Sequence, residues 1–529
     1  MRLAPIPTTV VTVLAAGALI GAAAAVDAPQ SVTQEGETST VPVAQRTLVC
    51  PSLGGSEVTS AMLGMLALGE GPGEASGQSV PDEAVVTPLA PPADLLEDGA
   101  AGESPTASPS PSPSPTESQE VLTTVDERQA VIQQRVEVDE PTSYAVRATG
   151  AMAPGFTAEQ SVVADSSEQY GLAGTSCSQP AREHWFVGST GEVGDRGRLV
   201  LSNPSEAPAV VDVNVWDDSG DVSAPGTQDI GVPAGGQVML LVDALAPDAP
   251  GVGLQVSASQ GQVSAAIESR LTEGVEPQGL SYIPAASPPS TDVVVPGIPA
   301  SGERTLQVFA PGDTDAIVTM RILGPDGPFS PAGQDVVTVP AGTVVDVPLD
   351  DAVGNSPAAV ELSSDQPVTA AARTVVPPED GSGDHSVSSA AAPLQGPAAT
   401  LLGRTSWDYD TSLVLSSVSD QPAGATVQFI DDAGEVIEEE EVDVAPGATA
   451  TVDVPAVSGA TFSRAVVQPQ APDTLAAARW TRRAASEGAA VDVAPLVSPP
   501  SEVTVPEVVS ELPADLEPPE PGSGNSGVD

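Results

Sequence analysis

A strand-like stretch recurs three times along this chain at one fixed spacing. The residues "RLVLSNPSEAPAVVDVNVWDDSG" at 198–220 meet "TLQVFAPGDTDAIVTMRILGPDG" at 305–327 after a shift of 107 positions, and "SLVLSSVSDQPAGATVQFIDDAG" at 412–434 after a second shift of 107. No gap is needed, and every copy has Leu at its second position and Gly at its last. A repeat of domain length indicates one folded unit built three times in tandem.

Each copy alternates apolar and polar residues in its second half. In the first copy Val211, Val213 and Val215 alternate with Asp212 and Asn214, and the other two copies keep the alternation. Successive side chains of a strand point to opposite faces, so this pattern indicates a strand of an antiparallel sheet with one buried face. We count six or seven short strands per copy, which is typical of an antiparallel β-sandwich with immunoglobulin-like proportions.

The fold class predicted from these signals is all-β, with tandem Ig-like sandwiches and disordered Pro-rich or acidic segments. Alternating Pro and Ser in "GESPTASPSPSPSPTESQE" cannot pack a core, so we interpret it as part of a disordered insertion. The predicted parts are a signal peptide or N-terminal membrane anchor at 1–28, an N-terminal β-domain at 40–181 split by an insertion at 71–119, sandwich repeats at 182–285, 288–392 and 395–495, and a disordered acidic tail at 498–529.

The N-terminus predicts export. One Arg precedes an apolar run from about Val10 to Val26, and small residues crowd the end of the run. This pattern is typical of a secretory signal peptide, and the run is also near the length that spans a bilayer. We therefore expect an extracytoplasmic protein that is either secreted or anchored to the cell membrane by this segment.

The chain contains two cysteines, Cys50 and Cys177. An even pair in an exported chain indicates one disulfide, and the alternative is two free thiols. The two residues stand near the first and last strand signals of the N-terminal β-domain. A bond between them would hold the ends of that domain together despite its insertion.

The charge of the chain argues against nucleic acid as a partner. The net charge is −55, and all 17 basic residues are Arg. Such a surface repels phosphate backbones and keeps the protein soluble.

No motif for catalysis, metal or cofactor binding is present, so we expect none of these. The two histidines, His184 and His385, have no zinc-ligand spacing, and no G-x-S-x-G stretch occurs. The segment "EDGSGDH" at 379–385 has the alternating acids of a calcium loop. Counted from Asp380, however, its sixth residue is His and its twelfth is Ala. We interpret this segment as a flexible acidic linker between the second and third repeats.

These features predict a non-catalytic cell-envelope protein that acts as a structural scaffold or protein-interaction module. The alternative is an extracellular glycan-binding protein, with Trp407 and Tyr409 of "SWDYD" as sugar contacts, and Trp216 and Trp480 as further aromatic candidates. The other interpretation, which the residues favour, is that these rings fill the ends of the sandwich cores. The expected partner is an envelope protein or polysaccharide, and the Ser and Thr residues of the Pro-rich stretch either carry O-linked sugars or form a bare spacer.

Four short motifs carry a resemblance to a known family. They are "LVCP" at 48–51, "GLAGTSC" at 171–177, "HWFVG" at 184–188 and "LSNP" at 201–204. With them the chain resembles a family of large exported actinobacterial proteins that is classed as a domain of unknown function. The resemblance implies a secreted or envelope location, and it supplies no reaction and no functional residue.

Overall fold

The computed structural model describes residues 38–51, 60–68, 81–91, 121–126, 132–136, 142–166, 169–377, 382–402, 409–431, 433–455, 462–485 and 488–506. The predicted signal peptide or anchor at 1–28 lies outside these residues. The chain divides into two units. Residues 42–502 form the larger unit. Strands β1 (Thr38–Pro42) and β34 (Glu502–Pro506) pair with each other, and all their residues except Pro42 and Glu502 belong to the smaller unit. Among the described residues, no helix has the length and apolar character of a membrane span.

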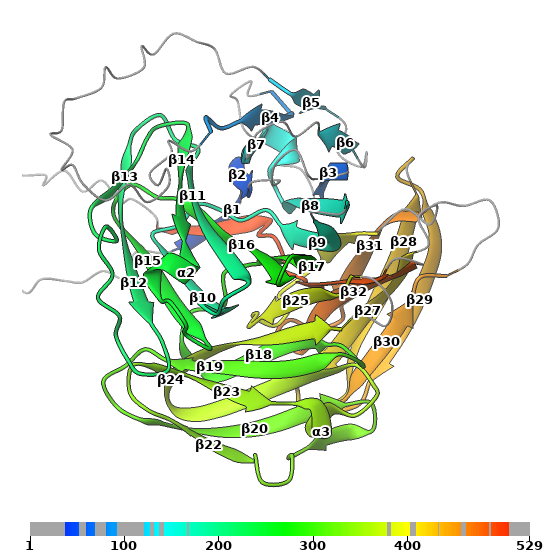
Figure 1. Ribbon diagram of the computed structural model, residues 1–529. Helices are drawn as coiled ribbons and strands as arrows, with labels where there is room; N and C mark the ends of the chain where they lie inside the picture. The colour runs from blue at the N-terminus through cyan, green and yellow to red at the C-terminus, as the bar shows by residue number, and fades with distance from the viewer. Residues whose placement is uncertain are drawn as a thin grey trace, which may run out of the picture. The chain divides into compact units, whose positions relative to one another are not determined.

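The larger unit consists almost entirely of antiparallel strands, which confirms the predicted all-β class (Figure 1). We divide its strands into four consecutive modules, A to D. Module A holds β2 (Gln45–Cys50), β3 (Ser60–Ala67), β4 (Ala84–Pro88), β5 (Thr123–Val125), β6 (Ile132–Val136), β7 (Tyr144–Thr149), β8 (Phe156–Asp165) and β9 (Tyr170–Ser176). Module B holds β10 (Glu183–Ser189), β11 (Asp195–Asn203), β12 (Ala209–Trp216), β13 (Ile230–Val232), β14 (Gly236–Leu241), β15 (Val252–Gln260), β16 (Ser264–Glu273) and β17 (Glu276–Ile283).

The other two modules follow in the same manner. Module C holds β18 (Ser290–Ile298), β19 (Glu303–Ala310), β20 (Ala316–Gly324), β21 (Gly327–Phe329), β22 (Val336–Val339), β23 (Thr343–Pro348), β24 (Ala358–Val376) and β25 (Asp384–Ser389). Module D holds β26 (Ala398–Leu401), β27 (Tyr409–Ser417), β28 (Ala423–Asp431), β29 (Val436–Val444), β30 (Thr449–Asp453), β31 (Phe462–Pro469), β32 (Leu475–Ala485) and β33 (Gly488–Pro495). Short helices α2 (Val242–Leu245) and α3 (Asp350–Val353) follow β14 and β23.

All four modules share one topology. One sheet of a module joins its first, sixth, third and fourth strands, and the other joins its fifth, second, seventh and eighth strands. In module C the long strand β24 serves as both the sixth and the seventh strand, because it pairs with β18 and β20 in its first half and with β19 and β25 in its second half. The short strands β21 and β22 both pair with β20 and together take the fourth position, so that β23 is the fifth strand and β25 the eighth. The expected count of six or seven strands was therefore too low. Some of these strands, such as β13, have only three residues and give little sequence signal.

The alternation seen in the sequence places one side of each strand in a core. In β12, Val211, Val213 and Val215 are buried, while Asp212 and Asn214 are only half-buried. The equivalent strands β20 and β28 have the same alternation. Each module has a core of its own, so burial of these apolar side chains is the main term that stabilises each sandwich.

Module A corrects one sequence interpretation. The insertion predicted at 71–119 is not continuous, because β4 lies inside it and pairs with both β5 and β7. Ala84 and Val86 of β4 are fully buried in the module core. The Pro/Ser-rich stretch itself, within 92–120, lies outside the described residues. Module A does not share the 107-residue spacing of the other three modules, because its strands are separated by longer stretches of sequence.

The predicted acidic tail also begins too early. Residues 498–501 continue the larger unit, where the Ser501 carbonyl accepts a hydrogen bond from the Val43 N–H at 3.0 Å. Residues 502–506 then form β34. The rest of the predicted tail, 507–529, lies outside the described residues.

The predicted disulfide between Cys50 and Cys177 is present, with 4.2 Å between the two Cα atoms. Cys50 ends β2, Cys177 follows β9, and both are buried. The bond therefore joins the first and last strands of module A. It closes a chain separation of 127 residues, for which chain entropy predicts a stabilisation of about 4–5 kcal/mol.

Two deletions test the assignment of β4. Replacing residues 92–120 with a short Gly/Ser linker should change the unfolding free energy by no more than about 1–2 kcal/mol, because closure entropy grows only logarithmically with loop length. Deleting residues 71–119 should cost at least about 4 kcal/mol, because it removes buried side chains and ladder hydrogen bonds of β4. Chemical denaturation of both variants measures the difference, and equal stabilities would contradict the assignment.

Candidate functional site

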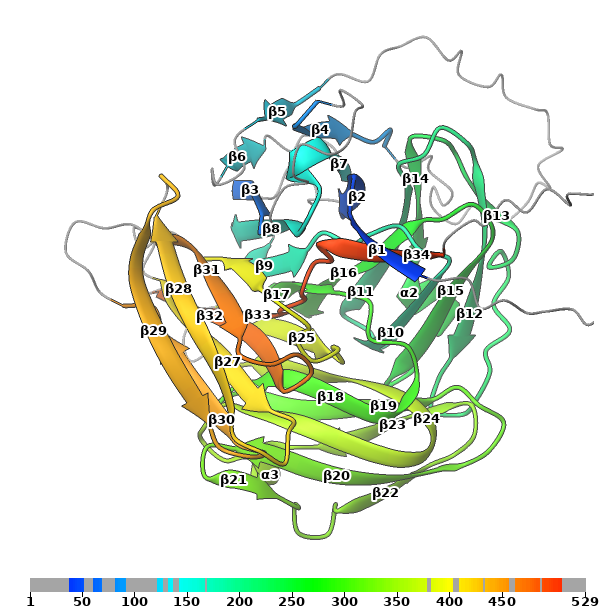
Figure 2. The same ribbon diagram turned by 180° about the vertical axis from the view of Figure 1, so that it is seen from behind.

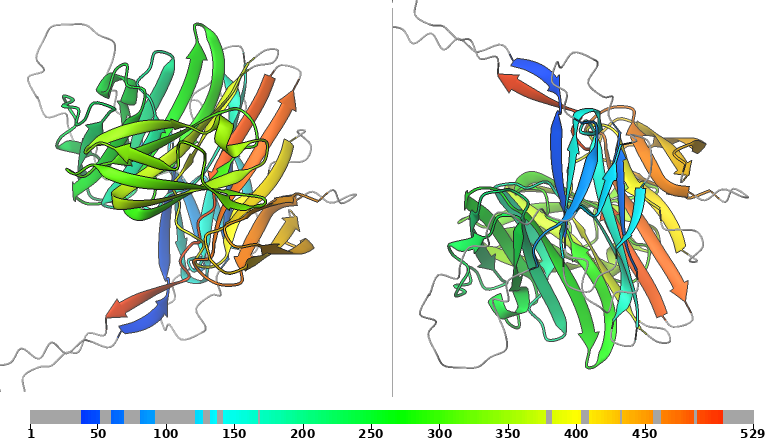
Figure 3. Two further views of the ribbon diagram at one scale, coloured as in Figure 1. Left: turned by 90° about the horizontal axis from the view of Figure 1, so that it is seen from below. Right: turned by 90° about the horizontal axis from the view of Figure 1, so that it is seen from above.

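The last strands of the four modules lie next to one another. Strand β9 contacts β17, β17 contacts β25, β25 contacts β33, and β33 contacts β9. Figures 1 and 2 show β9, β17 and β25 side by side from opposite directions, and Figure 2 adds β33. Figure 3 gives two further views of the same modules. The four modules thus form a closed cycle around their eighth strands, which resembles the way propeller blades surround an axis.

One carboxylate lies at the centre of this cycle. Asp384, the first residue of β25, is fully buried. Its Oδ2 accepts hydrogen bonds from the N–H groups of Val491 at 2.8 Å and Leu172 at 3.2 Å. Its Oδ1 accepts from the N–H groups of His385 at 2.8 Å and Leu280 at 3.2 Å. A single side chain of module C therefore binds the backbone of modules A, B and D.

The backbone approaches this carboxylate so closely that two neighbours must be glycine. Gly171 and Gly279 have φ values of 145° and 125°, in the left-handed region that L side chains rarely adopt. A Cβ on either residue would also collide with the Oδ1 atom of Asp384. The Gly-Leu pairs of "GLAGTSC" and "PQGLSY" therefore have the same role. In each pair the Gly leaves room for the Asp384 carboxylate, and the N–H of the following Leu donates to it.

From the sequence, the segment 379–385 is interpreted as a flexible acidic linker, and this interpretation is wrong for Asp384 and His385 at its end. Asp384 and His385 are fully buried members of β25, although their surroundings in the sequence have linker composition. Burial raises the pKa of Asp384 well above its usual range. The four N–H groups act against this rise, because they stabilise the ionised form.

A second buried network joins module A to module D. Arg479 of β32 lies 3.3 Å from Glu159 of β8 and 2.5 Å from Asp492 of β33. Glu159 also accepts hydrogen bonds from the Leu401 N–H at 2.7 Å and the Thr400 hydroxyl at 3.2 Å. Burial raises the pKa of both Glu159 and Asp492, and the Arg479 charge opposes this in each case.

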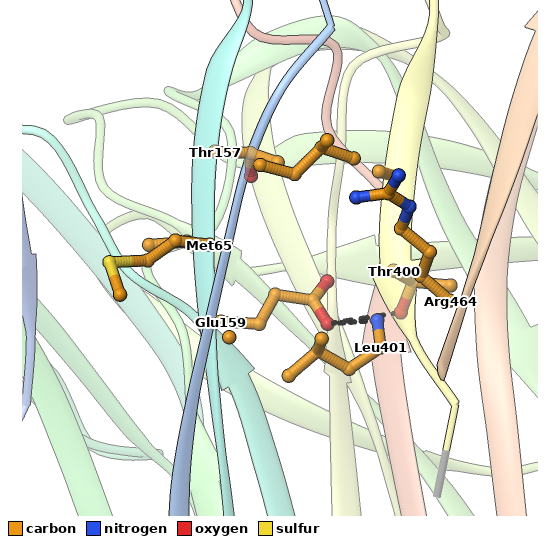
Figure 4. Close-up of a pocket in the computed structure, with 10 residues that line it drawn as sticks. Met65, Thr157, Glu159, Thr400, Leu401 and Arg464 are labelled. Atoms are coloured by element: carbon orange, nitrogen blue, oxygen red, sulfur yellow. Dashed lines mark hydrogen bonds between the residues drawn. The ribbon is translucent and has the colours of Figure 1, made fainter. Parts of the chain in front are cut away.

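A small cavity of about 20 Å³ lies beside Glu159. Figure 4 shows the Glu159 carboxylate turned toward Thr400 and Leu401, with Met65, Thr157 and Arg464 around the cavity. This volume holds about one water molecule, and most of the lining is apolar. The cavity is therefore a packing feature of the interface between modules A and D, and it is too small for a substrate.

A third buried network joins modules B and C, and it contains Ser, His and Asp. The Ser269 hydroxyl lies 2.9 Å from Nε2 of His385 and donates to Asp195 at 3.0 Å. In a hydrolase triad the His lies between the nucleophile and the acid, whereas here the Ser lies between the His and the Asp. All three residues are buried, and Asp195 pairs with Arg373 at 3.0 Å. The arrangement does not fit nucleophilic catalysis.

The buried side chain of His184 forms a hydrogen bond with the protein backbone. Its Nε2 lies 2.7 Å from the carbonyl oxygen of Val263, and the side chain is buried. Burial lowers its pKa. Among the described residues, no group of three or more His, Cys, Asp or Glu side chains is placed to hold a metal ion.

Two of the three described aromatic candidates, Trp216 and Tyr409, pack between modules. Trp216 of module B lies 5.2 Å from Phe309 of module C, measured between ring centroids. Tyr409 of module D packs against a buried cluster that contains Tyr170 of module A. Trp480 lies under the guanidinium of Arg482, 5.6 Å from the ring centroid. Trp407, the other proposed sugar contact, lies outside the described residues.

The sequence reasoning missed the groups that join the modules, namely Asp384, Glu159, Arg479 and Asp492. One faint signal was present, because "AAAR" occurs at both 370–373 and 476–479 in a chain with few basic residues. Arg373 and Arg479 both prove to be partners of buried carboxylates.

These observations define the class: an all-β protein whose four eight-stranded modules meet at their last strands through buried polar groups. Residues 131–455 match the Family of unknown function (DUF5719), and the chain belongs to this family. The expected resemblance to a family of unknown function is thereby confirmed. No curated protein matches the chain.

One solved structure aligns with most of the chain. A crystal structure of Salmonella alpha-2-macroglobulin reacted with methylamine aligns with 88% of this chain and 30% of its own, at 11% identity and a TM-score of 0.11. A likeness at that TM-score supports no argument about fold or function.

A buried and an exposed arginine on β32 test the network between modules A and D. Arg479→Ala should lower the unfolding free energy by about 3–5 kcal/mol, because it leaves Glu159 and Asp492 buried without their cation. Arg482→Ala removes an exposed pair with Asp410 and should cost less than about 1 kcal/mol. Chemical denaturation compares the two variants, and a cost for Arg479→Ala as small as that of the control would contradict the role of the network.

His385 should make stability depend on pH. Burial, reinforced by the Arg373 charge and opposed by Asp195, lowers its pKa from 6.5 to about 4. Between these values the unfolded state takes up a proton that the folded state does not, so stability is lost as pH falls. Relative to His385→Gln, whose side chain does not titrate, the wild type should lose about 3 kcal/mol between pH 7 and pH 4.

Denaturation midpoints of both proteins across this pH range measure the loss. Other titrating groups, including Asp384 and Glu159, contribute equally to both proteins and cancel in the difference. A stability difference that does not change with pH would show that His385 titrates normally in the folded protein.

Proposed function

We propose that the protein is a non-catalytic, exported cell-envelope protein that acts as a structural scaffold and protein-interaction module. The observation that carries the proposal is the junction at Asp384, where one buried carboxylate binds the backbone of all three other modules. Such a junction opposes relative motion of the modules, because separating any of them would leave buried polar groups without partners. A stiff assembly of sandwiches is suited to presenting surfaces at fixed positions.

Two further features support an extracytoplasmic scaffold. The Cys50–Cys177 disulfide fits an oxidising compartment outside the cytoplasm. The buried networks are occupied by structural contacts, and the Ser, His and Asp residues among them are inaccessible to a substrate. The buried groups of these networks are thus accounted for by contacts between modules.

A surface of module C is suited to a protein partner. Ile317 of β20 and Val336 of β22 are both about half exposed, at 52% and 53%. Ile317 pairs with Thr338 and Thr319 pairs with Val336, so the two apolar side chains are diagonal neighbours on one face of the sheet. By contrast, the edge strand β29 of module D exposes consecutive Glu residues, which discourage edge-to-edge association.

Site-specific crosslinking tests this function. A photoreactive amino acid at position 317 of the full-length protein should give a crosslinked protein product in intact cells of the source organism. The matched control carries the same group at Ser219, an exposed position in a turn of module B. The absence of a product beyond the control would argue against the interaction role, and a product removed by polysaccharide-degrading enzymes would favour the glycan-binding alternative.

A further inference from the structure

A polar groove of about 510 Å³ lies between modules A and B. Module A contributes Thr47 of β2 and Arg147 of β7. Module B contributes Pro204, Ser205 and residues 261–262, and the segment that links the modules contributes Pro180 and Arg182. The groove lies outside the buried networks described above, and two guanidinium groups line it.

The backbone on both sides of the groove is held in place. Thr47 and Arg147 are register partners on neighbouring antiparallel strands, so their side chains stand on the same face. Next to the disulfide, Ser178 exchanges two backbone hydrogen bonds with Val49, at 2.8 and 2.9 Å. Arg182 follows within a few residues, and its carbonyl accepts the Ala258 N–H at 2.7 Å.

The Ser205 corner of the groove is equally fixed. The fully buried Asn203 amide accepts the Ser205 N–H at 3.0 Å and the Ser205 hydroxyl at 2.7 Å. Its Nδ2 donates to the carbonyls of Ala207 at 2.8 Å and Val232 at 3.2 Å. The "LSNP" motif therefore builds a rigid wall of the groove, and that wall presents a hydroxyl and a proline ring.

The charge in the groove is opposite to that of the chain. The protein has 72 acidic and 17 basic residues, and eight of the described arginines form ion pairs with carboxylates. Arg147 and Arg182 are exposed, and no carboxylate of the described residues forms an ion pair with either. Two cations thus remain available in one groove of a strongly acidic protein.

We propose that this groove binds an anionic saccharide, with the Arg147 and Arg182 guanidinium groups on its acid group. A guanidinium presents a planar fork of donors that matches the oxygens of a phosphate or a carboxylate. Thr47, Ser205 and Gln262 supply hydroxyl and amide groups for sugar hydroxyls, and the volume lies in the range of small-ligand sites. The inference goes beyond the scaffold role and does not depend on it.

Calorimetric titration of the full-length protein tests the proposal. The probes are glucose 6-phosphate, glucuronate, glucose and inorganic phosphate, so that phosphate and carboxylate sources are compared separately. We expect the wild type to bind at least one of the two acidic sugars more tightly than glucose or inorganic phosphate. Arg147→Ala and Arg182→Ala should each weaken that binding by about tenfold, through loss of a charge-assisted bidentate contact.

The control is Arg196→Ala, which removes an exposed arginine that does not line the groove. It carries the same change in net charge and should bind as the wild type does. Arg182→Lys keeps the charge but loses the fork, so an affinity between wild type and Arg182→Ala supports bidentate contact. Thermal unfolding verifies that each variant is folded.

Three results would overturn the proposal. The first is a wild type that binds neither acidic sugar. The second is an equal loss in Arg196→Ala, which would show a general effect of charge. The third is inorganic phosphate that binds as tightly as glucose 6-phosphate, which would show that the groove does not recognise the sugar.

Discussion

The carboxylate of Asp384 accepts backbone hydrogen bonds that the shared topology of the modules would otherwise leave unmade. The eighth strand of each module is the edge of its sheet, and one row of its N–H groups has no partner within the module. Where four such edges meet in the interior, these donors need an acceptor or they cost free energy. Asp384 accepts one of these N–H groups from each of the four strands, and the residue before each donor of another module is small: Gly171, Gly279 or Ala490.

The repeats must therefore differ at this one position. An Asp at each equivalent place would crowd four carboxylates into a dry site, where like charges disfavour ionisation. The neighbouring interfaces also use different polar groups, with Glu159, Arg479 and Asp492 between modules A and D, and Asp195 and Arg373 between B and C. Buried ion pairs of this kind add little net stability, but they penalise wrong partners, so they favour one cyclic order of the modules.

Local features of the chain explain which parts of this structure were predictable. The alternation in β12, β20 and β28 is a property of neighbouring residues, so the sequence revealed the sandwiches and three of the modules. Module A has the same topology but connections of other lengths, and a fixed-spacing comparison does not detect it. The junction joins residues as far apart as Leu172 and Val491, and Asp384 stands in a segment with the composition of a linker. Nothing local distinguishes it from a solvated acid.

Closure of the cycle by β33 against β9 also constrains how such a chain can evolve. Open repeat arrays tolerate gain or loss of a copy, because each repeat contacts only its neighbours in the sequence. In this chain the last module contacts the first, so a duplicated or deleted 107-residue segment would separate the two faces that complete the cycle. Unequal recombination between the similar repeats would then produce chains that cannot close. The copy number is expected to be fixed at four, while the loops and connections, which lie outside the junction, remain free to change in length.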